Sequence, residues 1–260
     1  MRLLQLFKKS INLFLHPLRL VELYKAKKLL KRYKTLFYAN NPLRYFEMRA
    51  VCLSREDPVE FFDHYTVFSY WVAEFVNGLN NGKRVLDVGG KKLLNAILSL
   101  NNEVTSVVLA DCGDKISKVR YVIHDISNKL PFPDNYFDIF TSPGTLHLCG
   151  LGRYGDILNP NALVDFIKEL DRVMKKENSH LFLILPLGRN HLLFNLHFIF
   201  DFNTIINLFS GWHLEDYFVD EFVHFGKREE QKPKERFSKN ISTNDFKLGE
   251  YKIVYLHFRR

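Results

Sequence analysis

Short apolar stretches alternate with amphipathic ones through the middle of the chain. Five stretches rich in Val, Ile, Leu or Phe are expected to be strands, within residues 84–90, 104–111, 121–126, 131–142 and 180–188. "KKLLNAILSLN" (91–101) and "NALVDFIKELDRVMKK" (161–176) carry their apolar residues at helical spacing. Strands of this composition alternating with helices predict a Rossmann-like, doubly wound α/β fold, with a mostly parallel sheet covered on both faces.

Both ends of the chain add to this pattern. "WHLEDYFVDEF" (212–222) and "YKIVYLHFRR" (251–260) alternate like strands, predicting an antiparallel C-terminal hairpin around a solvated, charged loop at 227–240. Residues 54–79 predict a helix with Ser54 as N-cap and with Asn80-Asn81-Gly82 at its end, and residues 1–38 predict helix broken at Pro17. We therefore expect an N-terminal helical arm over 1–50 and an α/β domain over 51–260.

The net charge of +8 belongs to the arm. Residues 1–34 hold ten of the 37 Lys and Arg residues and one of the 29 acidic residues, which leaves 27 basic and 28 acidic residues in the remainder. A basic helix with an apolar stripe is typical of segments that lie on an anionic membrane surface. The alternatives are packing on the protein's own domain or on a partner, and, less favoured, RNA binding.

The remaining composition excludes several classes of protein. The three cysteines are far apart and no His or Cys cluster has metal-ligand spacing, so we expect neither a disulfide framework nor a metal site. No apolar run approaches the roughly 20 residues of a membrane-spanning helix. We expect a cytoplasmic protein that can bind the inner face of the membrane through its arm.

Candidate site residues follow the predicted strands. They are Asp87, Gly89 and Gly90 after the first strand, Asp111 after the second, Asp125 after the third, and the polar stretch 142–156 after the fourth. Carboxyl ends of parallel strands meet at one edge of a sheet, where ligands bind near the point at which strand order reverses. Any single aspartate could cap a helix or a turn, but an acid or a glycine loop at the end of each of four consecutive strands predicts a small-molecule site.

This arrangement resembles the class I S-adenosylmethionine-dependent methyltransferases. The resemblance implies S-adenosylmethionine as cofactor, with Asp87, Gly89 and Gly90 in the first loop, Asp111 on the ribose and Asp125 near the adenine. Lys91 and Leu93 stand where that family usually has further glycines. They are expected to narrow the pocket or to mark a fold that has lost catalysis.

A second resemblance is carried by "GLGRYGD" (150–156), "NP" (159–160) and "LLFNLHFIF" (192–200). These stretches resemble the bacterial domain-of-unknown-function family 268, whose members often accompany surface-polysaccharide genes. An acid-histidine pair usual in that family is here Leu146-His147. The resemblance implies an enzyme that O-methylates a sugar of a surface polysaccharide or of its nucleotide- or lipid-linked precursor.

Roles in such a reaction can be assigned to the loop residues. A sugar hydroxyl must lose its proton, so His147, Asp156 and His197 are the candidate bases. Arg153 would bind an anionic part of the acceptor, Tyr154 would stack on a sugar, and Asn195 is a further acceptor-binding candidate. Each histidine could instead make a structural hydrogen bond, and Arg153 could pair with Asp156. The alternative functions are a non-catalytic scaffold of the same fold and an RNA methyltransferase.

Overall fold

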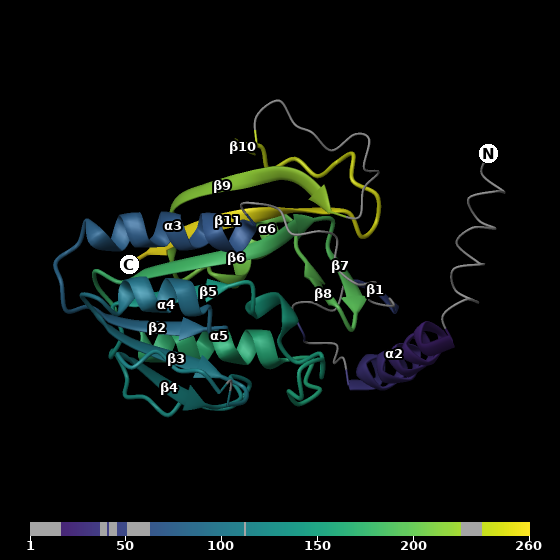
Figure 1. Cartoon of the computed structure of the whole chain (residues 1–260). Coiled ribbons are helices and arrows are strands. Elements are labelled where there is room, and N and C mark those ends of the chain that lie inside the picture. Colours follow the sequence, from purple (N-terminus) through teal and green to yellow (C-terminus); the bar gives the residue numbers. More distant parts are fainter. Residues whose placement is uncertain (1–16, 37–40, 42–45, 51–62, 112, 225–235) are drawn as a thin grey trace.

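An eight-stranded sheet forms the centre of the molecule (Figure 1). The computed structural model describes residues 17–36, 41, 46–50, 63–111, 113–224 and 236–260. Five strands run parallel: β2 (Arg84–Val88), β3 (Glu103–Val108), β4 (Val119–Ile123), β5 (Ile139–Pro143) and β6 (His180–Gly188). The antiparallel strands are β11 (Tyr251–Arg259), β9 (His213–His224) and β10 (Phe237–Ser238). The predicted mostly parallel sheet with an antiparallel C-terminal hairpin is confirmed.

Helices cover both faces of this sheet (Figure 1). α3 (His64–Asn77) and α4 (Lys92–Leu98) pack on one face, and α5 (Ala162–Val173) and α6 (Phe202–Leu208) on the other. Side chains alternate across a strand, so β6 sends Leu181 and Leu183 into the core under α5 and Phe182 into the core under α3. This explains why β6 is apolar along its length.

The sheet order places the switch point between β2 and β5. The order is β10-β9-β11-β6-β5-β2-β3-β4, so the chain moves outward from β2 to β4 and then returns to β5 on the other side of β2. The helices that follow β2 and β5 lie on opposite faces, which opens a crevice at the carboxyl ends of these strands.

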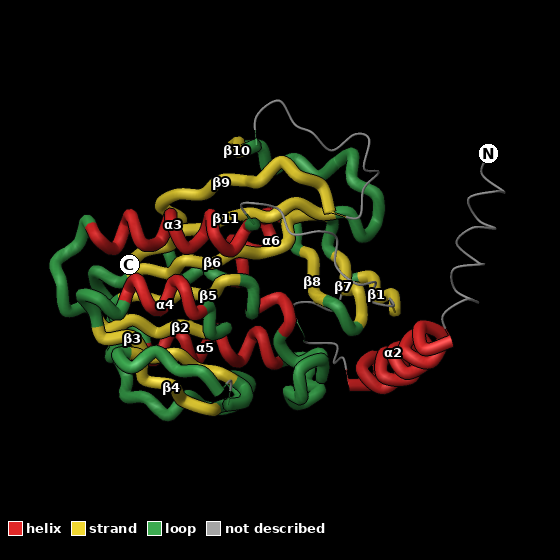
Figure 2. The backbone as a smooth tube through the Cα atoms, viewed as in Figure 1, coloured by secondary structure: helices red, strands yellow, loops and turns green. Residues whose placement is uncertain are grey.

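A second, smaller sheet follows β6 and was not predicted. It has the order β1-β7-β8, from β1 (Glu47–Ala50), β7 (His191–Phe194) and β8 (His197–Ile199) (Figure 2). β1 pairs with β7 in parallel, and β8 returns antiparallel to β7. Because β7 begins three residues after β6 ends, this small sheet lies at the edge where the large sheet's parallel strands end.

The basic arm is packed on the body where it is described. α2 (Pro17–Leu36) buries Ala26 and Tyr33, and the Tyr33 ring lies 5.2 Å from that of Phe194 in β7. Pro17 is the first residue of this helix, and the predicted helix before it lies outside the described residues. Ser54, the predicted cap of the next helix, also lies outside them; Asp63 caps α3 by accepting a hydrogen bond from the Thr66 amide.

Candidate functional site

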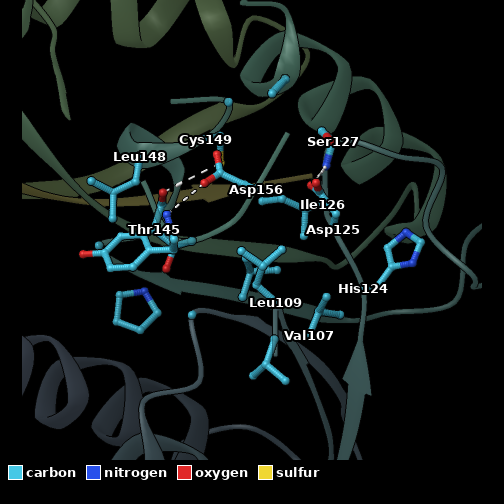
Figure 3. Close-up of a pocket in the computed structure, with 18 of the residues that line it drawn as sticks. Val107, Leu109, His124, Asp125, Ile126, Ser127, Thr145, Leu148, Cys149 and Asp156 are labelled. Atoms are coloured by element: carbon cyan, nitrogen blue, oxygen red, sulfur yellow. Dashed lines mark hydrogen bonds between the residues drawn. The ribbon is translucent and has the colours of Figure 1, made fainter. Parts of the chain in front are cut away.

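A cavity of about 310 Å³ opens at the carboxyl ends of the parallel strands (Figure 3). Its wall comes from the ends of β2, β3, β4 and β5 and from the loop after β5. Figure 3 shows Val107, Leu109 and Ile126 on one side and Leu148 and Cys149 on the other. Further lining residues include Tyr65, Gly89, Lys91, His124, Asp125, Ser127, Thr145, Tyr154 and Asp156. A largely apolar wall with a few polar groups at the switch point is typical of a small-molecule site.

Asp125 lies in the cavity wall. Its Oδ1 accepts a hydrogen bond from the Ser127 amide at 2.9 Å, and its Oδ2 accepts one from the Ile157 amide at 3.3 Å. The second bond ties the loop after β5 to the end of β4. Asp125 therefore both lines the cavity and fixes the loop that closes one side of it.

Asp87 is a buried residue that lies beneath the cavity and stabilises the surrounding structure. It is fully buried, and its carboxylate accepts hydrogen bonds from the Gly90 amide (3.0 Å), Asn95 Nδ2 (2.9 Å), Ser106 Oγ (2.7 Å) and Thr141 Oγ1 (3.1 Å). Burial raises the pKa of this carboxyl, and the four hydrogen bonds oppose that rise. Asp87 thus shapes the loop and its strands; Gly89 lines the cavity, and Gly90 donates its amide to Asp87.

Two predicted residues lie outside the cavity wall. Asp111 does not line the cavity: it is exposed, and its carboxylate accepts from the Gly113 amide at 3.0 Å and from Lys115 Nζ at 3.1 Å. Leu93 does not narrow the cavity either, since it is 58% exposed on α4. Lys91 does line the cavity beside Gly89, with its Nζ 3.4 Å from the centre of the Tyr65 ring.

Asp156 stabilises the loop of residues 150–156 through hydrogen bonds to its backbone. Its carboxylate accepts hydrogen bonds from the amides of Gly152 and Tyr154, both at 3.1 Å. Arg153 Nη1 instead donates to the Leu196 carbonyl at 3.1 Å, and its guanidinium lies 4.8 Å from the Tyr154 ring centre. The alternative pairing of Arg153 with Asp156 is therefore wrong. Asp156 and the exposed Tyr154 line the cavity, whereas Arg153 reaches toward the small sheet.

The two predicted histidines come together beside this loop. The His147 ring, in a 3₁₀ turn (Leu146–Leu148), and the His197 ring, at the start of β8, lie 5.6 Å apart edge to face. Burial lowers the pKa of His197 to about 3 and holds that of His147 well below its usual range, with further lowering by nearby Arg153. Asn195, the third predicted residue of this region, lies in the turn that precedes His197. Neither histidine lines the cavity itself.

A family model describes most of this chain. Residues 84–252 match the family described as "Caenorhabditis protein of unknown function, DUF268". The chain belongs to this family. That description names Caenorhabditis and not the bacterial source expected from the sequence. A comparison with curated proteins gave no match.

Several of the solved structures similar to this DUF268 chain are described as methyltransferases. The N-methyltransferase NodS from Bradyrhizobium japonicum, in complex with S-adenosyl-L-homocysteine, has a TM-score of 0.49 and 8% identity, covering 89% of this chain and 98% of that one. A S-adenosylmethionine-dependent methyltransferase from Leishmania major has a TM-score of 0.49 and 11% identity over 75% and 72% of the two chains. The 1,6-didemethyltoxoflavin-N1-methyltransferase of Burkholderia thailandensis has a TM-score of 0.48 and 14% identity over 77% and 80%. These likenesses concern the fold alone.

The DUF268 chain places further side chains beside the site that the sequence analysis missed. His224 ends β9 and Tyr251 begins β11, paired in register, with their rings stacked at 4.7 Å. His64 and Tyr65 begin α3 next to them, with ring centres 4.0 Å apart. The rule that identified Asp125, a polar residue at the carboxyl end of a strand, also selects His224 when applied to β9.

Two features are absent from the described part of the chain. Within it, no group of three His, Cys, Asp or Glu side chains is arranged to hold a metal ion. None of its helices is both long enough and apolar enough to cross a membrane.

Proposed function

We propose that the chain is a S-adenosylmethionine-dependent methyltransferase. The observation that carries the proposal is the cavity of about 310 Å³ at the switch point, bounded by the glycine loop after β2 and by Asp125 after β4. In an open α/β sheet this is where a nucleotide-like ligand binds. The methyltransferase-type fold supports the proposal but does not establish an activity, since one fold can serve many functions.

The residues of the cavity fit the chemistry of this cofactor. Val107, Leu109 and Ile126 offer an aliphatic surface to the flat adenine, and the Asp125 carboxylate can accept hydrogen bonds from the nucleoside. Lys91, beside the glycine loop, brings a cation to the end of the cavity where the carboxylate of the methionine moiety would lie. Lys91 is thus compatible with cofactor binding, although the usual loop has glycine there.

The acceptor that we propose is a sugar hydroxyl, on a surface polysaccharide or its nucleotide- or lipid-linked precursor. When bound, S-adenosylmethionine supplies an electrophilic methyl group. Tyr154, 60% exposed at the cavity wall, offers a ring face to a sugar. Burial lowers the pKa values of His147 and His197, so both imidazoles are neutral at neutral pH and are weak proton acceptors. Asp156 lines the cavity as a further acceptor.

Calorimetric titration of the full chain with S-adenosylhomocysteine tests the proposal. Ser127 lies in the cavity wall and is partly exposed, so Ser127→Phe should occupy cavity space and weaken binding at least tenfold. Ser117 is exposed and does not line the cavity, so Ser117→Phe should leave the affinity unchanged. We expect micromolar binding to the unsubstituted chain.

Absence of binding at millimolar ligand would contradict the proposal. The scaffold alternative would then be favoured, in which the cavity has lost its cofactor and the fold serves assembly with other proteins. Equal weakening by Ser127→Phe and Ser117→Phe would place the ligand elsewhere.

We further propose that α2 contacts an anionic membrane surface. Opposite its buried face, Val21, Tyr24 and Lys25 lie along one exposed stripe of the helix. Six exposed cations accompany the two apolar side chains: Lys25, Lys27, Lys28, Lys31, Arg32 and Lys34. Each Lys or Arg near an anionic surface contributes about 1 kcal/mol of binding free energy.

Cosedimentation with vesicles of phosphatidylglycerol and phosphatidylcholine tests this contact. We expect binding that rises with the anionic lipid fraction and falls at least tenfold in Lys28→Glu/Arg32→Glu. Lys118→Glu, an exposed cation of the body, should have little effect. Tight, salt-sensitive binding to RNA with no binding to anionic vesicles would instead favour the RNA alternative.

A further inference from the structure

Arg153 is a cation without a carboxylate partner in the described part of the chain. Its contacts there are the Leu196 carbonyl at 3.1 Å and the Tyr154 ring at 4.8 Å. Asp156, the nearest acid along the loop, accepts hydrogen bonds from the backbone amides of Gly152 and Tyr154. Arg153 is partly buried, so its positive charge is incompletely screened by water.

Two imidazoles next to Arg153 have nitrogens without partners. Nδ1 of His147 and Nε2 of His197 are buried atoms with no hydrogen bond to any described residue. The two rings lie 5.6 Å apart, and the His197 side chain is only 5% exposed. Buried polar atoms are nearly always hydrogen-bonded, so two such nitrogens beside one guanidinium indicate a ligand that supplies acceptors.

A continuous row of rings connects this place to the cavity. The His197 ring lies 4.8 Å from Tyr251, which stacks on His224 at 4.7 Å. His224 lies 6.3 Å from His64, whose ring is 4.0 Å from that of Tyr65 in the cavity wall. The unpartnered nitrogens therefore lie at one end of this row of rings, on the side of the small sheet, and Tyr65 at its other end lines the cavity.

Other charged groups around the row are of both signs. Lys91 lies against Tyr65, and Asp63 accepts a hydrogen bond as the cap of α3. Arg236 and Asp220 form an ion pair at 3.0 Å, so they offset each other. A neutral ligand would leave the charge of Arg153 uncompensated, whereas an anionic ligand would balance it.

We propose that Arg153, His147 and His197 together bind a phosphate ester of the methyl acceptor. This rests on the proposed methyltransferase function and specifies the chemistry of its substrate. The planar guanidinium donates two parallel hydrogen bonds to phosphate oxygens, and each imidazole donates one through its N–H. His147 and His197 are thereby anion-binding residues of one site, and the phosphate holds the acceptor hydroxyl at the end of the cavity.

Imidazole resonances of the full chain labelled with ¹⁵N-histidine report this site directly. Titration with inorganic phosphate should shift two resonances in a saturable way, and loss of those resonances in His147→Gln and His197→Gln assigns them. His213, exposed at the start of β9, should not shift. Equal shifts of all histidines, or none at His147 and His197, would overturn the proposal.

Arg153→Gln provides the decisive variant. It should weaken phosphate binding at least tenfold, while Lys118→Gln, an exposed cation elsewhere, leaves it unchanged. If Arg153→Gln lowers the melting temperature strongly, Arg153→Lys replaces it: the charge remains, the paired donors are lost, and affinity should fall at least threefold. Unchanged affinity in the folded Arg153 variant would overturn the proposal.

Three further probes identify the source of the phosphate. Glucose 1-phosphate and uridine diphosphate glucose represent soluble sugar phosphates, and vesicles containing phosphatidic acid represent a lipid phosphate. The preferred probe should give the same His147 and His197 shifts as inorganic phosphate at lower concentration. Glucose binding as tightly as glucose 1-phosphate would contradict an anion site.

Failure of this inference and failure of the proposed function can be told apart. The same samples are titrated with S-adenosylhomocysteine, whose affinity should not change in Arg153→Gln because Arg153 does not line the cavity. Phosphate shifts without S-adenosylhomocysteine binding would retain the anion site and reject the methyltransferase. S-adenosylhomocysteine binding without phosphate shifts would do the reverse.

Discussion

At the scale of single residues, acids that look alike in the sequence have different positions. Asp87 is buried with four hydrogen-bond donors around its carboxylate, Asp111 is exposed, and Asp125 lies in the cavity wall. All three follow strands, so the pattern alone assigns them to one site. Their burial and hydrogen bonds, which depend on neighbouring strands, separate the structural acid from the acid that can meet a ligand.

Asp87→Ala should lower the free energy of unfolding by about 3 kcal/mol or more, because removing the acceptor leaves buried donors unsatisfied. Those donors are the Gly90 amide, Asn95 Nδ2 and the hydroxyls of Ser106 and Thr141. Urea denaturation of the variant and of Asp111→Ala measures the effect. Asp111→Ala should leave the unfolding curve unchanged. A similar decrease in the free energy of unfolding in both variants would show that the hydrogen bonds of Asp87 do not stabilise the fold.

At the scale of elements, the loop of residues 150–156 shows why its glycines are needed. Gly150 has φ +75°, and a Cβ there would lie 2.0 Å from the Asn159 carbonyl oxygen and 2.8 Å from Ala162 Cβ. The chain therefore turns tightly enough to pack on the start of α5, while Tyr154 is exposed and Arg153 reaches the Leu196 carbonyl. Gly155 has φ +89° but no atom within 4 Å of such a Cβ, so its glycine serves the backbone angle alone.

These two glycines form a matched pair for substitution. Gly155→Ala should cost only the strain of a left-handed backbone, about 1 to 2 kcal/mol. Gly150→Ala adds a steric clash with backbone and should cost at least about 2 kcal/mol more. Thermal and urea unfolding of both variants measure the difference, and equal costs would show that the contact with residues 159–162 is not tight.

At the scale of the whole molecule, histidines from different elements gather at one end of the large sheet. His64 comes from α3, His197 from β8 and His224 from β9. Burial lowers the pKa of His197 to about 3 and those of His64 and His224 to about 4. Arg153 lowers the pKa of His197 further, and His224 that of His64, while Asp63 and Asp220 oppose the lowering at His64 and His224.

This clustering predicts loss of stability in acid. In the unfolded chain, His64, His197 and His224 take up protons near pH 6.5, whereas in the folded chain they do so only near pH 3 to 4. The free energy of unfolding is therefore highest above about pH 6.5 and falls as the pH drops below that value. Each histidine contributes up to about 1.4 kcal/mol per pH unit.

Urea denaturation between about pH 7 and pH 4.5 measures this slope. His197→Gln should reduce the slope by about one proton, whereas His213→Gln, at an exposed position, should not change it. A slope in His197→Gln equal to that of the unsubstituted chain would contradict the burial of His197 as a neutral group.

The sequence by itself determined the α/β class, the order of the main strands and helices, and the edge of the sheet at which the cavity lies. It could do so because apolar periodicity depends on local geometry and because parallel strands bring their carboxyl ends together. Asp125, Gly89, Tyr154 and Asp156 were identified on this basis, and all four line the cavity. The family followed from "GLGRYGD" and "LLFNLHFIF".

Only the tertiary structure decided which groups meet across long separations in the chain. Asp111 lies outside the cavity wall, and Asp87 is buried beneath the cavity. α2 packs on β7 through Tyr33. Rings from distant parts of the chain form one row, from His64, His147, His197, His224 and Tyr251. No local pattern links these positions, because their contacts depend on strand order and on packing between elements. The short strands of the small sheet were missed for the same reason: three or four residues carry too little periodicity to predict, and their pairing stabilises them.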